Sequence, residues 1–315
     1  MRLVTSWRWP AGLIQALKVL ERGGRECTLH FAPSWMELRH GGGGGGPAVQ
    51  CRFGLSTFHE YGVESRDPAG IACEAQVGDL LAALRSAWGF LKANGAREAV
   101  EPQAFRMVLS KKGRAPLLRV KVRRFVGEPD SVRMVHDVPV TLLAAGAPAA
   151  DLLGRPASGG VQLRVPAEAL ARLRDFTLSA RDVSKVLSVL ARRDAEGRVL
   201  LALGAEADSV RVISRITLAR TLPGGVDEDD EDNSDADADA DGGFNGGGGG
   251  GAATAEVSVR LMQLANVLAL QNFDGQAAVV RISEASLLLV FDLGVGTGGI
   301  HPAKLAYCVH AVDPA

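Results

Sequence analysis

The chain carries an internal repeat, which constrains its fold more than any other feature of the sequence. Residues Trp9–Leu17 read WPAGLIQAL and residues Val165–Leu173 read VPAEALARL, an offset of 156 residues. In both copies, a run typical of a strand meets a proline suited to the first position of a helix. A second pair, Val77–Leu84 and Leu261–Leu268, lies 184 residues apart. We therefore expect two similar domains, each with two short amphipathic helices.

Short segments between these helices have the pattern of strands. Leu118–Arg123 (LRVKVR) alternates, which would give a sheet one apolar and one basic face. Gly113-Arg114 and Ala195-Glu196-Gly197 are typical of hairpin turns. The expected strands are Thr28–Phe31, Ser34–Arg39, Val49–Phe53, Ile71–Gln76, Phe105–Ser110, Leu117–Arg124, Val132–Val140, Val161–Val165, Val186–Ala191, Val199–Leu203, Val210–Leu218, Glu256–Val259, Ala277–Ser283, Leu287–Leu293 and Leu305–Val312. Each half thus predicts an α+β domain of mostly antiparallel sheet with two helices, which argues against a doubly wound nucleotide-binding fold.

Composition divides the chain at three places. Gly41–Gly46 is an unbroken glycine run, which we expect to form a flexible loop in the first half. Residues 144–158 are rich in alanine, glycine and proline and are expected to connect a first domain, residues 1–143, to a second, residues 159–315. Within the second domain, residues 223–255 are predicted to form a disordered acidic and glycine-rich insertion.

In the net charge of the chain, the acidic insertion offsets the positive charge of the other residues. The formal net charge is −1, yet Asp227–Asp241 holds ten acidic residues and no basic one. Without this segment the chain carries a formal charge of +9. A basic body of this kind is suited to a polyanionic partner, although such a surplus also occurs in proteins that bind none. The acidic segment could screen the basic surface, bind a basic partner or act as a neutral spacer, and we favour the spacer.

The sequence gives no support for membrane spans, metal sites or disulfide frameworks. Charges or glycines interrupt every apolar run before it reaches the roughly 18 residues that a span needs. The spacings of Cys27, Cys51, Cys73 and Cys308 fit neither a zinc site nor a compact disulfide framework. We expect no membrane association, no metal, no cofactor and reduced, structural cysteines.

Three motifs resemble catalytic or metal-binding signatures, and we expect none of them to act as one. Gly294–Gly299 matches G-x-G-x-x-G, but a dinucleotide site needs a helix after the loop, and the following residues predict a hairpin. Asp237–Gly242 resembles the start of a calcium loop, yet the twelfth position is Gly248 instead of a bidentate glutamate. His136 and Asp137 are adjacent, so on a strand their side chains point to opposite faces. We expect no catalytic residue.

Basic residues lie on or beside three of the four expected helices. If these helices share one side of the molecule, the bases could neutralise phosphates without reading sequence. An ordinary solvated helix face is the alternative for any one of them. The fourth expected helix, Leu261–Gln271, carries no lysine or arginine, which counts against a uniform stripe. The residues are Lys18, Arg22 and Arg25 with the first helix, Arg85 and Lys92 with the second, and Arg172 and Arg174 with the third.

Several segments resemble the HUS-type subunit of the heterotrimeric DNA-damage checkpoint clamp, the nine-one-one complex. They are Met1-Arg2-Leu3, Glu26–Pro33 (ECTLHFAP), Gly62–Ser65 (GVES), Val135–Val140 (VHDVPV), Val257–Arg260 (VSVR) and Val290–Leu293 (VFDL). The resemblance spans nearly the whole chain except Gly41–Gly46, the acidic insertion and Gly294–Gly299. It implies the sliding-clamp fold, in two similar domains.

The resemblance also implies which surfaces of a non-catalytic ring subunit are used. Helices line the inner surface, which implies DNA-facing positions at Arg22, Arg25, Arg85 and Arg172, with Lys18, Lys92 and Arg174 on or beside the same helices. Sheets of neighbouring subunits join edge to edge, because an exposed strand edge is an unmet hydrogen-bonding surface. By position, the expected edges are Val132, Arg133, Met134, Val135, His136 and Asp137 on one side and Val210, Arg211, Val212, Ile213, Ser214 and Arg215 on the other.

The leading hypothesis is a nuclear checkpoint clamp subunit that encircles double-stranded DNA without sequence specificity. The resemblance implies two other clamp subunits in a heterotrimer, an ATP-driven clamp loader, and repair and checkpoint factors as partners. A homotrimeric replicative processivity clamp is the alternative, and self-assembly discriminates the two. A nucleotide-binding or hydrolytic enzyme that uses Gly294–Gly299 or His136 is less favoured.

Overall fold

The computed structural model describes most of the chain. The described residues are 1–41, 46–96, 100–123, 133–144, 152–153, 161–194, 198–207, 210–218, 254–268, 277–293 and 303–312. Several features of the sequence analysis lie outside them: Val132, the turn 195–197, the segments 42–45, 219–253 and 294–302, and most of the expected connector. No helix in the described part is long and apolar enough to span a membrane.

The four expected helices are present in the structure. They are α1 (Pro10–Gly23), α2 (Val77–Ala93), α3 (Ala167–Ala180) and α4 (Leu261–Leu268). Each helix buries one face, because apolar residues recur at spacings of three and four. In α1 that face includes Leu13, Leu17 and Leu20, none of them exposed. The expected extension of α4 to Gln271 lies outside the described residues.

The two prolines of the repeat differ in position. Pro10 lies in the first turn of α1, where its missing N–H costs no intrahelical hydrogen bond. Pro166 is instead the N-cap of α3, with an extended backbone at φ −68° and ψ 159°. Its carbonyl accepts the hydrogen bond from the Leu170 N–H at 3.0 Å, so the helix begins at Ala167. The expectation that Pro166 is the first helical residue was therefore wrong by one position.

The described strands fall into two series that follow the repeat. The first half contains β1 (Arg2–Trp7), β2 (Glu26–Phe31), β3 (Trp35–His40), β4 (Ala48–Gly54), β5 (Phe58–Glu64), β6 (Ile71–Gln76), β7 (Phe105–Lys112), β8 (Ala115–Arg123), β9 (Arg133–Pro139) and β10 (Thr141–Leu142). The second half contains β11 (Val161–Val165), β12 (Val186–Arg193), β13 (Val199–Ala207), β14 (Val210–Leu218), β15 (Thr254–Arg260), β16 (Ala278–Ser283), β17 (Ser286–Leu293) and β18 (Ala303–His310). Strands β5 and β10 have no counterpart among the expected strands, and β1 is the run typical of a strand that precedes Pro10.

These strands form three sheets. Their orders are β5-β1-β7-β8-β9, β10-β6-β2-β3-β4-β18-β17-β16-β11 and β14-β13-β12-β15. Every described pairing is antiparallel, as the sequence predicts. The order β1-β7-β8-β9 of the first half recurs as β11-β16-β17-β18 in the second, and β6-β2-β3-β4 recurs as β15-β12-β13-β14. The nine-stranded sheet arises because β4 of the first half pairs with β18 of the second.

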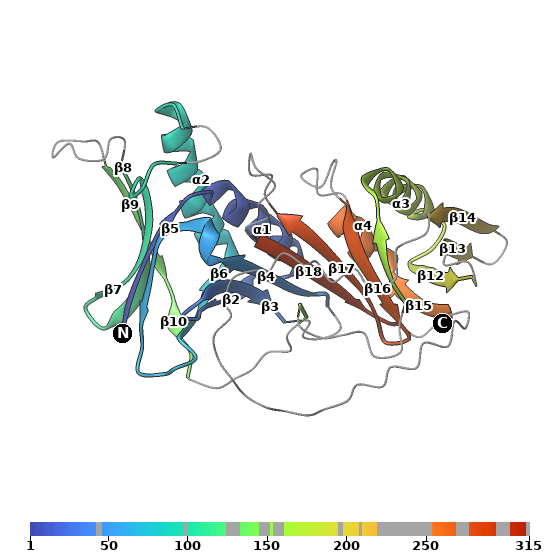
Figure 1. The fold of residues 1–315 in the computed structure, drawn as a ribbon, viewed down its shortest axis with the longest axis horizontal. Helices are drawn as coiled ribbons and strands as arrows, with labels where there is room; N and C mark the ends of the chain where they lie inside the picture. The colour runs from blue at the N-terminus through green and yellow to red at the C-terminus, as the bar shows by residue number, and fades with distance from the viewer. Residues whose placement is uncertain are drawn as a thin grey trace, which may run out of the picture.

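The helices lie together on one side of the molecule. In Figure 1 the four helices occupy the upper part of the view, and the strands form the lower part and both ends. Helix α1 packs against α2, and α3 packs against α4. The repeat therefore places all the basic helices of the sequence analysis on the same side.

Burial in the sheets follows the sequence pattern. Leu118, Val120 and Val122 are buried, whereas the intervening bases of β8 lie on the opposite face, as the alternation predicts. Gly113 has φ +63° in the tight turn that joins β7 to β8, which confirms the expected hairpin. The four cysteines are all buried and free, in agreement with the structural role expected for them.

Candidate functional site

The seven basic residues fall into two groups according to their exposure. Lys18 and Arg174 are half-buried, and the other five are exposed to solvent. Within the described part of the chain, Lys18, Arg25 and Arg172 make no ion pair. These three side chains can therefore meet an incoming anion without first giving up a partner.

The other predicted bases already have partners. Arg85 lies 3.8 Å from a carboxylate oxygen of Glu21 on α1, and both side chains are about half exposed. The Lys92 ammonium stands 5.5 Å from the ring centroid of Trp88, and Arg174 pairs with its neighbour Asp175 at 3.4 Å. The exposed pair of Arg85 and Glu21 contributes roughly 0–1 kcal/mol, so a phosphate could replace it at small cost.

Arg22 connects the two halves of the chain. Its Nη1 donates a hydrogen bond to the backbone carbonyl oxygen of Asn266 in α4 at 2.6 Å. This contact joins the end of α1 to the one helix that carries no lysine or arginine. Arg22 therefore has a structural role that the sequence did not indicate, in addition to the predicted one.

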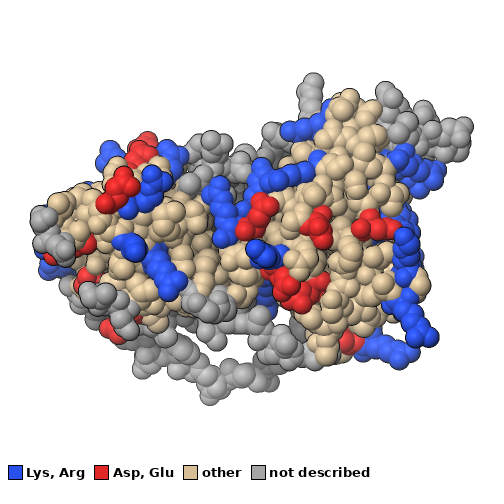
Figure 2. All heavy atoms as spheres, turned by 180° about the vertical axis from the view of Figure 1, so that it is seen from behind, with Lys and Arg blue, Asp and Glu red and all other residues tan. Residues whose placement is uncertain are grey.

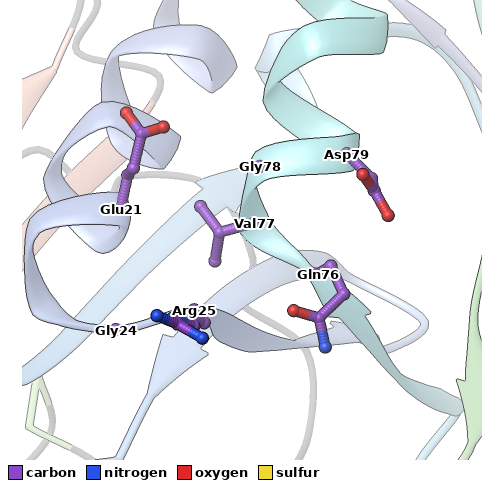
Figure 3. A pocket seen from close by; sticks show the side chains of 7 residues that line it. All are labelled: Glu21, Gly24, Arg25, Gln76, Val77, Gly78 and Asp79. Atoms are coloured by element: carbon purple, nitrogen blue, oxygen red, sulfur yellow. The ribbon is translucent and has the colours of Figure 1, made fainter.

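A hollow of about 470 Å³ lies where α1 ends and α2 begins. Figure 3 shows the residues that surround it, contributed by the end of α1, the short link from α1 to β2, the end of β6 and the start of α2. The Val77 N–H donates to the Arg25 carbonyl at 2.7 Å, which fixes the start of α2 against the end of α1. The lining residues are Glu21, Gly24, Arg25, Gln76, Val77, Gly78 and Asp79. With two carboxylates and one guanidinium, this hollow is not by itself an anion site.

The predicted interface residues lie on two strands at the ends of sheets. Strand β9 ends the five-stranded sheet and carries all the residues from Arg133 to Asp137, whereas Val132 lies outside the described residues. Strand β14 ends the four-stranded sheet and carries all those from Val210 to Arg215. Within the described part of the chain, neither strand has a second neighbour.

The side chains of β9 divide between its two faces. Arg119 of β8 binds the Asp137 carboxylate through two hydrogen bonds, of 2.6 and 3.0 Å, and these bonds lower the pKa of Asp137. The Nε2 of His136 is buried on the other face without a hydrogen-bond partner. His136 and Asp137 therefore do not form a dyad, as their alternation on a strand predicts.

The chain contains one completed edge-to-edge junction of the same type. Strand β4 pairs with β18 in a register that places Lys304 opposite Arg52 and Leu305 opposite Cys51. In the repeat, β4 occupies the place of β14, and β18 occupies the place of β9. The two free edges are thus the counterparts of two edges that already pair with each other inside the chain.

The remaining motifs do not form a catalytic or metal site among the described residues. The segment Gly294–Gly299 lies outside the described residues, and the residues described after it form strand β18, antiparallel to β17, instead of the helix that a dinucleotide site needs. In the described part, no group of three or more His, Cys, Asp or Glu side chains is placed to hold a metal ion. The calcium-like segment Asp237–Gly242 lies outside the described residues.

Comparison with known families shows to which family the chain belongs. The model of a family described as Hus1-like protein matches residues 1–313. This chain belongs to the Hus1-like family. A search of the curated proteins finds no significant match. The resemblance to the HUS-type checkpoint clamp subunit is therefore confirmed over almost the whole chain.

Solved structures place the Hus1-like chain in the sliding-clamp fold. PCNA from Thermococcus kodakaraensis has 16% identity and a TM-score of 0.60, with 99% of each chain covered. PCNA from A. fulgidus, bound to the C-terminal region of FEN-1, has 14% identity and a TM-score of 0.59, with 100% of this chain and 99% of that chain covered. A PCNA2–PCNA3 complex from Sulfolobus tokodaii has 13% identity and a TM-score of 0.57, with 99% of each chain covered. The expected fold class is confirmed.

Proposed function

We propose that this Hus1-like chain is a non-catalytic subunit of a ring-shaped DNA-damage checkpoint clamp. In this proposal it joins two other clamp subunits in a heterotrimer, is placed on double-stranded DNA by an ATP-driven loader, and acts in the nucleus. Family membership and the clamp fold support this function. One of the matching structures is a PCNA2–PCNA3 complex and another is a PCNA bound to the C-terminal region of FEN-1, which supports clamp subunits and repair factors as classes of partner.

The observation that carries the proposal is the pair of free edges. The chain pairs β4 with β18, and the repeat leaves the counterpart strands β14 and β9 at opposite ends of the sheet system. An unpaired edge exposes a row of N–H and C=O groups, and closure into a ring removes such edges. If β9 of one subunit pairs with β14 of the next, the junction inside the chain is repeated between chains.

The helices give this ring an inner surface suited to DNA. All four lie on one side of the molecule (Figure 1), and Arg22, Arg25, Arg85 and Arg172 are exposed there. Phosphate contacts from such residues attract any DNA sequence equally, because they do not reach base edges. This is the property that a sliding subunit needs. The interface roles assigned to residues 132–137 and 210–215, and the connector role assigned to residues 144–158, remain part of the proposal.

The mass of the assembly tests the proposed function. Light scattering of the purified chain alone should give a monomer, and co-expression with two different clamp subunits should give a trimer of one copy of each. A stable trimer of this chain alone would instead favour a homotrimeric replicative clamp. A chain that never assembles would contradict both clamp hypotheses and favour the hypothesis of an enzyme.

A further inference from the structure

The repeat allows the register of an intermolecular junction to be derived from the junction inside the chain. The Val77 N–H donates to the Arg25 carbonyl, and the Leu261 N–H donates to the Lys185 carbonyl at 2.9 Å, so these pairs are equivalent. Following the strand registers from these points makes Arg215 on β14 the counterpart of Arg52 on β4.

The hairpin turns give the counterpart of the other edge. Strands β7 and β8 close at Lys112 opposite Ala115, and β16 and β17 close at Ser283 opposite Ser286. Following the registers from these turns makes Val135 on β9 the counterpart of Lys304 on β18. If β9 of one subunit pairs with β14 of another in the register that β18 has on β4, Val135 therefore lies opposite Arg215.

In the internal junction, this row consists of two basic residues flanked by two acidic ones. Asp292, Lys304, Arg52 and Glu37 are successive register partners across β17, β18, β4 and β3. Glu37 is completely buried, and its Oε2 accepts hydrogen bonds from Arg52 and from the Gln50 amide at 3.0 and 2.7 Å. A buried carboxylate needs such partners, and Arg52 in turn gains a counter-charge at the junction.

The row that contains Arg215 on β14 has no acidic residue at the position equivalent to Glu37. The register partner of Arg215 on β13 is Ala202, which stands where Glu37 stands in the first half. Arg215 is exposed and makes no ion pair with the described residues. Its neighbour Arg211 differs, because it already lies 3.7 Å from Glu206. Arg215 is thus a charge at a strand edge to which the described residues of the chain supply no counter-charge.

In a second copy of this chain, the described residues of β9 do not supply that counter-charge. Val135 would face Arg215, and Lys121 is the next residue in the row. Two residues before Val135 on β9, Arg133 is the register partner of Arg123 on β8. The nearest acid of β9, Asp137, is hydrogen-bonded to Arg119. Figure 2 shows lysine and arginine side chains gathered along the right-hand edge of the view, the end at which Figure 1 places β7, β8 and β9. Self-pairing would bring two basic edges together.

We propose that β14 takes the edge strand of a different clamp subunit that presents an aspartate or glutamate opposite Arg215. The inference rests on the proposed edge-to-edge assembly and adds the chemistry of the partner. The carboxylate of the partner supplies Arg215 with a counter-charge, as Glu37 supplies one to Arg52. Cross-strand pairs of opposite charge stabilise an antiparallel junction, and like charges destabilise it, so one position selects against self-assembly.

Charge reversal at the edge tests this assignment. The chain is co-expressed with two other clamp subunits, and Arg215→Glu is compared with Arg192→Glu, an exposed position on the inner strand β12 of the same sheet. We expect Arg215→Glu to lose one neighbour, leaving a heterodimer, while Arg192→Glu keeps the trimer. A trimer that forms equally well with Arg215→Glu would overturn the inference, whereas a wild-type chain that assembles with no subunit would overturn the proposed function.

A second measurement needs no partner chain. Val135→Glu places a carboxylate between Lys121 and the Arg215 of another copy, so light scattering should show self-association of this variant above the mass of the monomer. Val135→Gln, which has nearly the same size, should stay monomeric, and so should the double variant Val135→Glu with Arg215→Glu. A monomeric Val135→Glu chain, or a wild-type chain that self-associates as strongly, would contradict the inference even if the heterotrimer forms.

Discussion

The guanidinium of Arg22 donates to the backbone carbonyl of Asn266 at 2.6 Å, which joins α1 to α4 across 244 residues of sequence. The contact links the helices on the two sides of the β4–β18 junction. It therefore ties a predicted DNA-facing residue to the arrangement of the two halves.

We expect Arg22→Ala to lower the free energy of unfolding by about 1 kcal/mol, since an exposed hydrogen bond from a charged group is lost. The measurement is the midpoint of urea unfolding. Arg25→Ala is the matched control, because Arg25 is equally an exposed arginine beside the end of α1 but donates no side-chain bond within the described residues. Equal midpoints for the two variants would show that the contact contributes nothing.

The salt dependence of DNA binding tests the basic helices. Each phosphate contact removed lowers the slope of log K against log salt by about 0.9, so Arg25→Gln with Arg172→Gln should lower it by about 2 in the assembled clamp. These two residues have no ion pair to give up in the described part of the chain. Arg66→Gln, exposed in the loop between β5 and β6, serves as control and should leave the slope unchanged.

Charge reversal at the paired arginines gives a harsher test. Arg22→Glu combined with Arg85→Glu should shorten retention of the clamp on DNA, because two attractive charges become repulsive and Arg85 no longer neutralises Glu21. Retention is measured on circular DNA, from which a clamp cannot slide off an end. If retention is unchanged, the helices do not face DNA.

The sequence predicted the features that depend on periodicity. The apolar spacing of α1 and the alternation of Leu118–Arg123 fix which face is buried, and both were correct. Strand β5 was missed because FHEYGVE buries little beyond Phe58 and carries few apolar residues. The Arg22 contact was also missed, since its acceptor is a backbone carbonyl that every residue possesses. The role of Glu37 depends on strand register, which no local pattern specifies.

The pair formed by Arg119 and Asp137 predicts a pH dependence. The hydrogen bonds from Arg119 lower the pKa of Asp137 below its ordinary value of 3.8 in the folded chain. The pair therefore stabilises the folded state above that value, and this contribution is lost as the pH falls through the lowered pKa. Asp137→Asn should be slightly less stable than the wild type at pH 7, and the difference in urea midpoint should shrink below about pH 4. A constant difference over that range would contradict the assignment.

The four thiols should be unreactive in the folded chain. Burial raises the pKa of Cys27 and Cys73 to about 12 and raises that of Cys51 and Cys308 as well, while the thiolate is the reactive form. Iodoacetamide at pH 8 should modify all four cysteines in denaturant and almost none without it, as measured by mass spectrometry. The denatured chain is the control, and rapid modification of the native chain would show that a thiol is accessible.

Glu37 lies one strand behind the internal junction, as the register partner of Arg52. Its carboxylate is completely buried and bound by Arg52 and Gln50, and the Gln50 Oε1 in turn accepts the N–H of Leu152 at 2.6 Å. The same carboxylate therefore supports both the β3–β4 register and the contact to Leu152, a residue of the expected connector.

Glu37→Gln should lower the free energy of unfolding by about 3 kcal/mol, because it leaves the partly buried Arg39 and Arg52 without their shared counter-charge. Thermal and urea unfolding measure this loss. Arg2→Ala is the control, since it removes an exposed ion pair to Glu64 with both side chains about 70% accessible, and should change stability by less than about 1 kcal/mol. Equal effects of the two substitutions would mean that the buried carboxylate does not hold the junction, and the charge-balance argument for Arg215 would lose its template.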